Sequence, residues 1–255
     1  MGNVLTQIHL DEDSDGAASL KATHVISALP LPVLDSILPQ QQQQQQSGAR
    51  TLPHLRANPH STVIVLNLVF PAPPKGTTTT TQQLHPPGFG YLIPRPEQRY
   101  PVTGSEHEPA SLLGVVFDSA SLPEQDDEFG TGALRFIKMS AMLGGPYPLP
   151  PSPSGPPDEE DRALLATVLP LISSQLGGST PLPEPLYYAV HRNVESIPTY
   201  LVGHTARMTE LRCALRERWG ERMKVVGAGV GGVSVADCVK AGRQAAREVG
   251  AHIDV

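Results

Sequence analysis

The chain has 255 residues, of which 39% are hydrophobic, 5% are aromatic and 17% are charged. This length and hydrophobic content suffice for one large or two small globular domains. The net charge of −6 argues against a nucleic-acid-binding protein, which needs a basic surface to neutralise phosphates. The two cysteines, Cys213 and Cys238, have neither a metal-binding spacing nor the number of a disulfide framework, so we expect both to be reduced and buried.

The N-terminal residues predict a β-hairpin. Residues 3–9 and 23–29 have the composition of strands, and the acidic sequence DEDSDG between them supplies a turn. A short amphipathic helix is expected in PLPVLDSILP. Its hydrophobic side consists of Val33, Leu34, Ile37 and Leu38. Residues 40–46 are consecutive glutamines, which have nothing to bury and predict disorder.

The central sequence predicts a mostly antiparallel sheet. Four segments rich in β-branched residues are separated by turn-rich loops: residues 61–70, 88–94, 112–119 and 133–143. The longest apolar run, residues 63–70, is far shorter than the roughly 20 residues that cross a bilayer, so we interpret it as a buried strand. A helix is expected in DEEDRALLATVLPLISSQL, with Pro170 as a kink or stop, followed by a strand in EPLYYAVHR.

The C-terminal sequence predicts a helix, a strand and a last helix. Residues 205–219 form the first helix, whose apolar side consists of Met208, Leu211, Cys213 and Leu215. RMKVVGAG is typical of a strand, and VADCVKAGRQAAREVG of a helix that ends at Gly250.

Between that strand and the last helix, VVGAGVGG carries the dinucleotide-binding pattern G-x-G-x-x-G at Gly227, Gly229 and Gly232. An acidic residue, Asp254, lies 22 positions after Gly232, but these 255 residues offer no sheet for a second strand to join, so we do not expect an independent Rossmann domain. The strand, glycine turn and helix suit an electron-rich ligand, because the first amides of a helix are unpaired and partly positive. Alternatively, the glycines only allow the strand and helix to pack closely.

Six blocks of the sequence occur in this order: THVISALPLPVLDSILP, GFGYLIP, GVVFDSASLPEQD, MLGGPY, VHRNVESIPTYLVGH and GVGGVSVADCVKAGRQAA. Together they resemble the C-terminal half of the oxygen-dependent protoporphyrinogen oxidase family, which is related to the amine oxidases. The resemblance implies an α+β to α/β fold: the C-terminal part of an FAD-binding fold, with an antiparallel substrate sheet and a strand and helix that return to the flavin domain.

The resemblance also implies which residues bind the cofactor. The last helix points its N-terminus at the pyrimidine edge of FAD, where reduction leaves negative charge that helix-terminal amides stabilise. The implied contacts are Gly232, Val233, Ser234 and Val235, supported by Asp237. Ala28 and Pro30 either pack near the cofactor or only end their strand. His191 and His204 are interpreted as structural, and no catalytic side chain or metal site is expected.

For the substrate, protoporphyrinogen IX, the family uses a narrow apolar slot against a sheet. The matching positions are Phe89, Gly90, Leu92 and Met142, which would otherwise be ordinary strand residues. The family implies molecular oxygen as the electron acceptor and a place at the mitochondrial inner membrane with peripheral membrane contact. The expected assembly is either a homodimer or association with an N-terminal half.

The family's opening G-x-G-x-x-G unit has no counterpart here, so the chain is expected to be truncated and to bind FAD poorly alone. The expected organisation is a partial FAD domain at 1–30, a linker with the glutamine run at 31–61, a substrate domain at 62–192 and a return to the FAD domain at 193–255. Disordered inserts are expected at 71–87, 95–111 and 146–158.

Two other functions are compatible with these residues. A related amine-oxidase-like or desaturase-like flavoenzyme would share the last strand and helix but differ at GFGYL and MLGG. A non-catalytic interaction fragment would use the sheet and its inserts to bind a partner. Flavin absorbance distinguishes the enzymes from the fragment, and porphyrin formation distinguishes the two enzymes.

Overall fold

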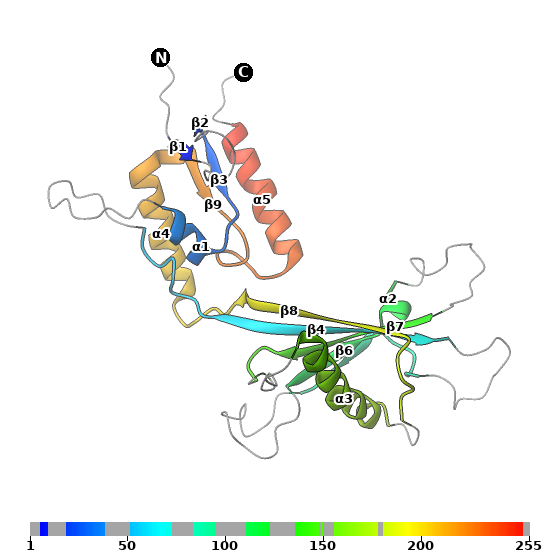
Figure 1. Cartoon of the computed structure of the whole chain (residues 1–255). Coiled ribbons are helices and arrows are strands. Elements are labelled where there is room, and N and C mark those ends of the chain that lie inside the picture. The colour runs from blue at the N-terminus through cyan, green and yellow to red at the C-terminus, as the bar shows by residue number, and fades with distance from the viewer. Residues whose placement is uncertain are drawn as a thin grey trace. The chain divides into compact units, whose positions relative to one another are not determined.

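The computed structural model describes residues 6–9, 19–38, 52–72, 84–94, 111–122, 136–147, 149, 156–177 and 181–251. Figure 1 shows the elements, which in chain order are β1 (Thr6–His9), β2 (Ser19–Ala22), β3 (Val25–Ser27), α1 (Leu31–Ile37), β4 (His60–Pro71), β5 (Gly90–Leu92), β6 (Leu112–Val116), α2 (Asp118–Ser121), β7 (Phe136–Gly144), α3 (Pro157–Gln175), β8 (Tyr187–Pro198), α4 (His204–Trp219), η3 (Gly220–Arg222), β9 (Met223–Val225) and α5 (Val235–Gly250). The chain divides into two compact units: unit 1 is Met1–His60 with Ile197–Val255, and unit 2 is Ser61–Ser196.

Unit 2 contains a five-stranded sheet with the strand order β5-β6-β7-β4-β8. The pairs β5–β6, β6–β7 and β4–β7 are antiparallel, as the sequence predicted. β8 lies beside β4, and the amide of Leu186 donates to the carbonyl of Val69. The strand expected in EPLYYAVHR extends well beyond that segment to Pro198, because pairing with a neighbouring strand can continue through polar residues that carry no hydrophobic signal.

One face of this sheet is buried under α3. Buried side chains alternate along the two central strands: Ile64, Leu66, Leu68 and Phe70 on β4, and Ile137, Met139, Ala141 and Leu143 on β7. α3 contributes Leu164, Leu165, Val168 and Ile172 to the same core. Because successive side chains of a strand point to opposite faces, the intervening residues of β4 and β7 lie on the other face.

The helix expected in DEEDRALLATVLPLISSQL is α3, and of the two alternatives for Pro170 the stop does not occur. The helix continues to Gln175, since residues on both sides of the proline pack on the sheet and offset the hydrogen bond that proline cannot donate. One predicted boundary in unit 2 is wrong: the strand expected at 112–119 ends at Val116, and α2 begins at Asp118.

Unit 1 contains two small sheets. β1 pairs with β2 in antiparallel fashion, and β3 pairs in parallel with β9, Val25 lying opposite Met223. The predicted hairpin between residues 3–9 and 23–29 is therefore wrong, because the partner of the first strand is Ser19–Ala22. Residues 23–29 do contain a strand, but its partner is distant in sequence and leaves no local signal. The DEDSDG turn and the glutamine run lie outside the described residues.

The core of unit 1 lies between α1, residues 52–55, α4 and β9. Its buried members are Leu31, Leu34, Leu52, Leu55, Met208, Leu211, Leu215 and Met223. Val33 and Ile37 were expected on the buried side of α1 but are exposed, because the helix turns Leu31 and Leu34 inward instead. Cys213 is also exposed, contrary to prediction; it and the half-buried Cys238 are free thiols.

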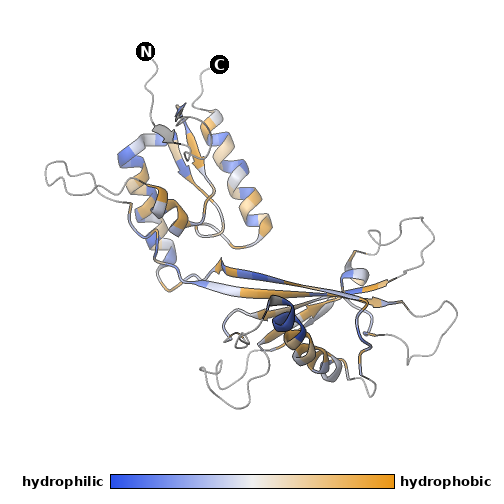
Figure 2. Ribbon diagram, in the orientation of Figure 1, coloured by the Kyte–Doolittle hydropathy of each residue, from blue (hydrophilic) through white to orange (hydrophobic). Residues whose placement is uncertain are grey.

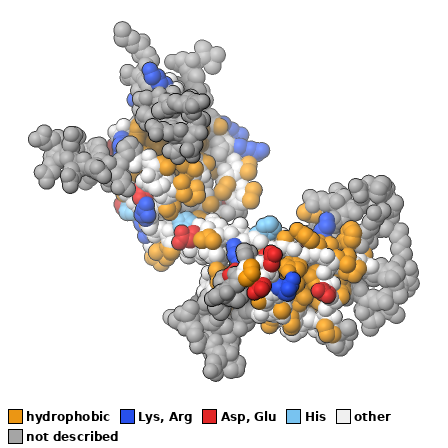
Figure 3. All heavy atoms as spheres, viewed as in Figure 1, with side chains coloured by type: hydrophobic (Ala, Val, Ile, Leu, Met, Phe, Trp, Pro, Cys, Tyr) orange, Lys and Arg blue, Asp and Glu red, His pale blue; other side chains and the backbone are white. Residues whose placement is uncertain are grey.

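The hydropathy of the helices agrees with this packing. Figure 2 shows hydrophilic and hydrophobic residues along both α4 and α5, as expected for helices with one side against a core. Hydrophobic side chains also reach the surface of each unit (Figure 3), and the exposed ones include Leu92 in unit 2 and Val235 in unit 1. Among the described residues, no helix is long and apolar enough to span a membrane.

Candidate functional site

The glycine-rich segment connects β9 to α5, as predicted. Gly227 and Gly232 have φ angles of 113° and 150°, which residues with side chains rarely adopt. A Cβ atom on Gly232 would lie 2.5 Å from Cγ of Asp237. Close packing of the segment against the first turn of α5 therefore requires glycine at position 232.

Side chains hold three consecutive carbonyls of this segment. The carbonyl of Ala228 accepts from the Tyr200 hydroxyl, that of Gly229 from Asn58 Nδ2 at 3.4 Å, and that of Val230 from His204 Nε2 at 3.2 Å. The rings of Tyr200 and His204 stack with their centroids 3.7 Å apart. Burial, which disfavours the charged phenolate, raises the pKa of Tyr200. The loop backbone is thus held from one side by three side chains.

His204 has the structural position expected from the sequence. Its Nε2 must carry a hydrogen, because the carbonyl of Val230 can only accept. Its Nδ1 lies 3.3 Å from Asn58 Nδ2 and accepts from it. His191 is exposed on β8. Asn58 and Tyr200 carried no sequence signal, since their role depends on contacts with a distant loop.

The residues expected to contact the flavin lie at the N-terminus of α5. Ser234 is the N-cap: its Oγ accepts from the amide of Asp237 at 3.1 Å and lies 2.6 Å from Asp237 Oδ2. Within the described part of the chain, the amides of Val235 and Ala236 have no hydrogen-bond partner. Val233 and Val235 are 51% and 81% exposed. The site is accessible to a ligand, and flavin contact here stays a prediction.

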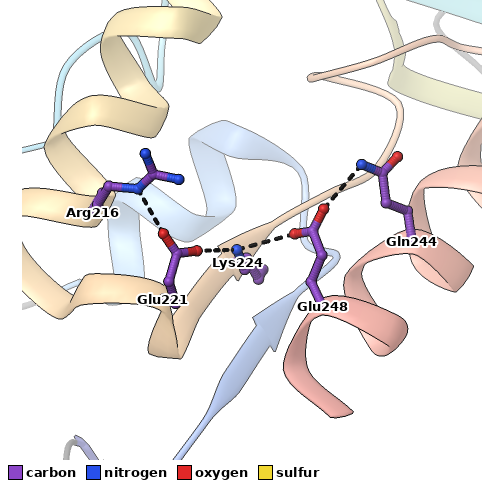
Figure 4. A network of polar contacts seen from close by, with 5 residues as sticks. All are labelled: Arg216, Glu221, Lys224, Gln244 and Glu248. Atoms are coloured by element: carbon purple, nitrogen blue, oxygen red, sulfur yellow. Dashed lines mark hydrogen bonds and ion pairs between the residues drawn. The ribbon is translucent and has the colours of Figure 1, made fainter. Parts of the chain in front are cut away.

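A cleft of about 650 Å³ lies beside this loop, between α4, β9 and α5. Lys224 of β9 bridges its walls by binding Glu221 Oε2 at 2.5 Å and Glu248 Oε2 at 3.0 Å. Arg216 binds Glu221 at 2.6 Å, and Gln244 donates to Glu248 at 3.0 Å, which extends the network from α4 to α5 (Figure 4). This network connects the last helix to the strand that precedes the glycine loop.

The network predicts how the stability of unit 1 depends on pH. The hydrogen bond from Lys224 lowers the pKa of Glu221, and hydrogen bonds from Gln244 and Lys224 lower that of Glu248, both from 4.5. The hydrogen bond to Glu221 raises the pKa of Lys224 from 10.5. The network contributes its full stability at pH values between the ordinary pKa values of 4.5 and 10.5. This stability is lost as the pH falls through the lowered pKa values or rises through the raised one.

Replacing Lys224 by methionine is expected to lower the free energy of unfolding of unit 1 by about 1–2 kcal/mol at neutral pH, because two hydrogen bonds between charged groups are lost. Urea unfolding followed by circular dichroism measures this change, and the difference from wild type should shrink below pH 4. The matched control is Arg243→Met, an exposed cation of α5 that does not line the cleft, which should change stability little. Equal effects of the two substitutions would contradict a stabilising role of the network.

The residues expected to contact the substrate lie in unit 2, and three of them share the sheet face opposite α3. The strand register places Leu92 opposite Gly114, Gly114 opposite Met142, and Met142 opposite Val65. Gly90 lies in the next row on the same face. Leu92 is 81% exposed and Met142 is half-buried, so this apolar row is available to a ligand.

Phe89 lies at the start of β5 and has a side chain that is 70% exposed. Its carbonyl accepts from the amide of Phe117 at 2.8 Å and from Ser121 Oγ at 3.3 Å, which connects β5 to α2. The four substrate candidates therefore belong to one region of unit 2, whereas the four flavin candidates belong to unit 1.

The sequence analysis assigned no function to three polar residues on the same sheet face: Asn67, Ser140 and Asp118. Ser140 Oγ lies 2.8 Å from Asn67 Oδ1 and 2.8 Å from Asp118 Oδ2. The sequence did contain one indication of this polar group, because Asn67 is a polar residue at the centre of the apolar run 63–70. Within the described ranges, no three side chains of His, Cys, Asp or Glu are grouped as metal ligands would be.

Comparison with known proteins supports the resemblance stated above, although no family model matches the chain. Bovine and human protoporphyrinogen oxidases are each 32% identical to it over 235 residues, which is 91% of this chain and 41% of the relative. The Schizosaccharomyces pombe protoporphyrinogen oxidase is 29% identical over 195 residues. The chain thus spans about two fifths of the length of the bovine and human relatives and 33% of the S. pombe one.

Solved structures confirm the predicted fold class. An Exiguobacterium protein, provisionally assigned as a protoporphyrinogen oxidase, superposes with a TM-score of 0.63 at 18% identity, over 97% of this chain and 44% of its own. Reduced UDP-galactopyranose mutase superposes with a TM-score of 0.50 at 9% identity, over 84% of this chain and 37% of its own. By sequence and by fold, this chain is similar to one part of the protoporphyrinogen oxidases, as expected for their C-terminal half.

Proposed function

We propose that the chain supplies the substrate sheet and the last strand and helix of the flavin domain of an oxygen-dependent protoporphyrinogen oxidase of haem biosynthesis. The observation that carries this proposal is the 32% identity to the bovine and human enzymes over 91% of the chain. The activity belongs to the complete protein, because the chain spans 41% of these relatives. Its product would be protoporphyrin IX.

The N-terminus of α5 fits the pyrimidine edge of FAD. When bound there, FAD would supply hydride acceptance from the substrate and electron transfer to molecular oxygen. The amides of Val235 and Ala236 are free of hydrogen bonds within the described residues and would donate to the electron-rich edge. The exposed side chains of Val233 and Val235 would exclude water from it, and Gly232 lets the backbone approach closely. Ser234, held by Asp237, keeps the helix end in this conformation.

The open face of the unit 2 sheet would contact protoporphyrinogen IX through Phe89, Gly90, Leu92 and Met142. Gly114 lies between Leu92 and Met142 in the strand register and adds no side chain to the row. The row therefore presents aliphatic and thioether surface that suits an apolar macrocycle. These residues would bind and orient the substrate, and none of them transfers a proton.

The small parallel sheet of unit 1 supports association with further polypeptide. Parallel sheets are normally larger and covered on both faces, whereas only β3 and β9 pair here among the described residues. Further strands would come from an N-terminal half, in the same chain or in another, with a second copy of this chain as the alternative. By analogy with its eukaryotic relatives, we assign the protein to the mitochondrial inner membrane through peripheral contact.

A chimera tests this function. The segment of the bovine enzyme that matches this chain is replaced by the 255 residues, and the unaltered bovine enzyme is the control. We expect bound flavin, detected by its absorbance, and growth of porphyrin fluorescence from protoporphyrinogen IX in air. Flavin without porphyrin would favour a related amine-oxidase-like or desaturase-like enzyme. Absence of flavin from a folded chimera would favour a non-catalytic fragment.

A further inference from the structure

A polar chain of three side chains lies on the face of the unit 2 sheet opposite α3, where Lys138 of β7 is a further polar residue. Ser140 of β7 lies opposite Asn67 of β4 and opposite Val116 of β6. Its hydroxyl oxygen is 2.8 Å from both Asn67 Oδ1 and Asp118 Oδ2, and all three side chains are partly buried. The polar row is adjacent to the row that contains Met142, since Ser140 and Met142 are successive residues on one face of β7.

The hydroxyl of Ser140 carries one hydrogen, so it can donate to only one of these two oxygens. The carboxylate of Asp118 is the stronger acceptor, and this charge-assisted hydrogen bond is preferred. Ser140 thus holds one oxygen of Asp118, and Asn67 Oδ1 lies beside the same hydroxyl as a second acceptor. The carboxylate of Asp118 keeps unused acceptor capacity.

A backbone contact places this acceptor next to the proposed substrate row. Asp118 follows Phe117 directly, and the amide of Phe117 donates to the carbonyl of Phe89 at 2.8 Å. Asp118 also forms no ion pair with any residue in the described part of the chain. A partly buried carboxylate without a cation favours a ligand that brings hydrogen-bond donors to it.

We propose that Asp118, positioned by Ser140 and Asn67, binds pyrrole N–H groups and selects the reduced macrocycle over the oxidised one. This inference rests on the proposed function. Saturated carbons join the four pyrroles of a porphyrinogen, so its rings tilt and turn their N–H groups toward an anion. In a porphyrin the conjugated ring is flat, and its two N–H groups point into the ring centre. A carboxylate beside the sheet can therefore bind the substrate but not the product, which favours product release.

The experiment measures the affinity of the full 255-residue chain for two probes under anaerobic conditions. Protoporphyrin IX binding is followed by its fluorescence, and protoporphyrinogen IX binding by competition with it. The wild-type chain should bind the reduced probe about tenfold more tightly than the oxidised one, as expected for a hydrogen bond to a charged group. Asp118→Asn should remove this preference. It should lower the affinity for the reduced probe about tenfold and change the affinity for the oxidised probe less than about twofold.

Three variants make the result specific. Asp118→Glu keeps the carboxylate and should restore part of the preference, and Ser140→Ala, which removes only the positioning hydroxyl, should reduce it by a smaller factor. Asp158→Asn removes an exposed carboxylate from α3 and should leave the preference unchanged. Equal affinities in the wild-type chain, or a preference that survives Asp118→Asn, would overturn this inference and leave the proposed function intact. Failure of the folded wild-type chain to bind either probe would also overturn this inference, whereas the chimera tests the proposed function separately.

Discussion

Replacing Gly114 by alanine is expected to lower the free energy of unfolding of unit 2 by about 3 kcal/mol, the upper end of the cost of overpacking. A Cβ atom at this position would lie 2.3 Å from the carbonyl oxygen of Tyr91 and 3.0 Å from Cα of Leu92. Both contacts are with the backbone of β5, so β5 and β6 would have to separate. Urea unfolding followed by circular dichroism measures the loss, and porphyrin binding should weaken because Leu92 is displaced.

The control is Gly242→Ala, in the interior of α5. A Cβ atom there meets no atom within 4 Å, and alanine has a higher helix propensity than glycine by up to about 1 kcal/mol. This variant should be at least as stable as the wild type. If Gly114→Ala unfolds at the wild-type urea concentration, the β5–β6 pairing that forms the proposed substrate surface is wrong.

Replacing Gly232 by alanine is expected to disrupt the proposed flavin contact. The new Cβ atom would lie 2.6 Å from Cβ of Asp237, and the φ angle of 150° is strained for alanine. Displacement of Asp237 would break its hydrogen bonds with Ser234, at a cost of about 1 kcal/mol for the lost cap. The strained backbone adds about 1–3 kcal/mol. Amide hydrogen exchange in the first turn of α5 should become faster, and the chimera should retain less flavin.

Gly231→Ala provides the matched control in the same loop. Its Cβ atom would meet nothing within 4 Å, and its φ angle is not in the left-handed region. Hydrogen exchange in α5 should therefore remain close to that of the wild type. Normal flavin retention by Gly232→Ala, together with unchanged exchange in α5, would show that this glycine does not maintain the helix end.

The sequence allowed prediction of those parts of the fold that depend on local patterns. Enrichment in β-branched residues between turn-rich loops identified β4 and β7, and the glycine segment between a strand and a helix was located correctly. The resemblance also selected Leu92 and Met142, which the strand register places in one row. Strand pairing was harder to predict from the sequence. β3 pairs with β9 near the other end of the chain, and no local pattern indicates that pairing.

The sequence by itself determined the secondary structure of the core elements and the similarity to protoporphyrinogen oxidase, because both depend on the type and order of residues. Only the tertiary structure decided which side chains meet. Asn58 and Tyr200 contact the glycine loop, and Asp118 contacts Ser140, through folds of the chain that bring distant residues together. A hydrogen bond requires two atoms within about 3 Å. Residue type supplies the atoms, but strand register and helix packing bring them within that distance.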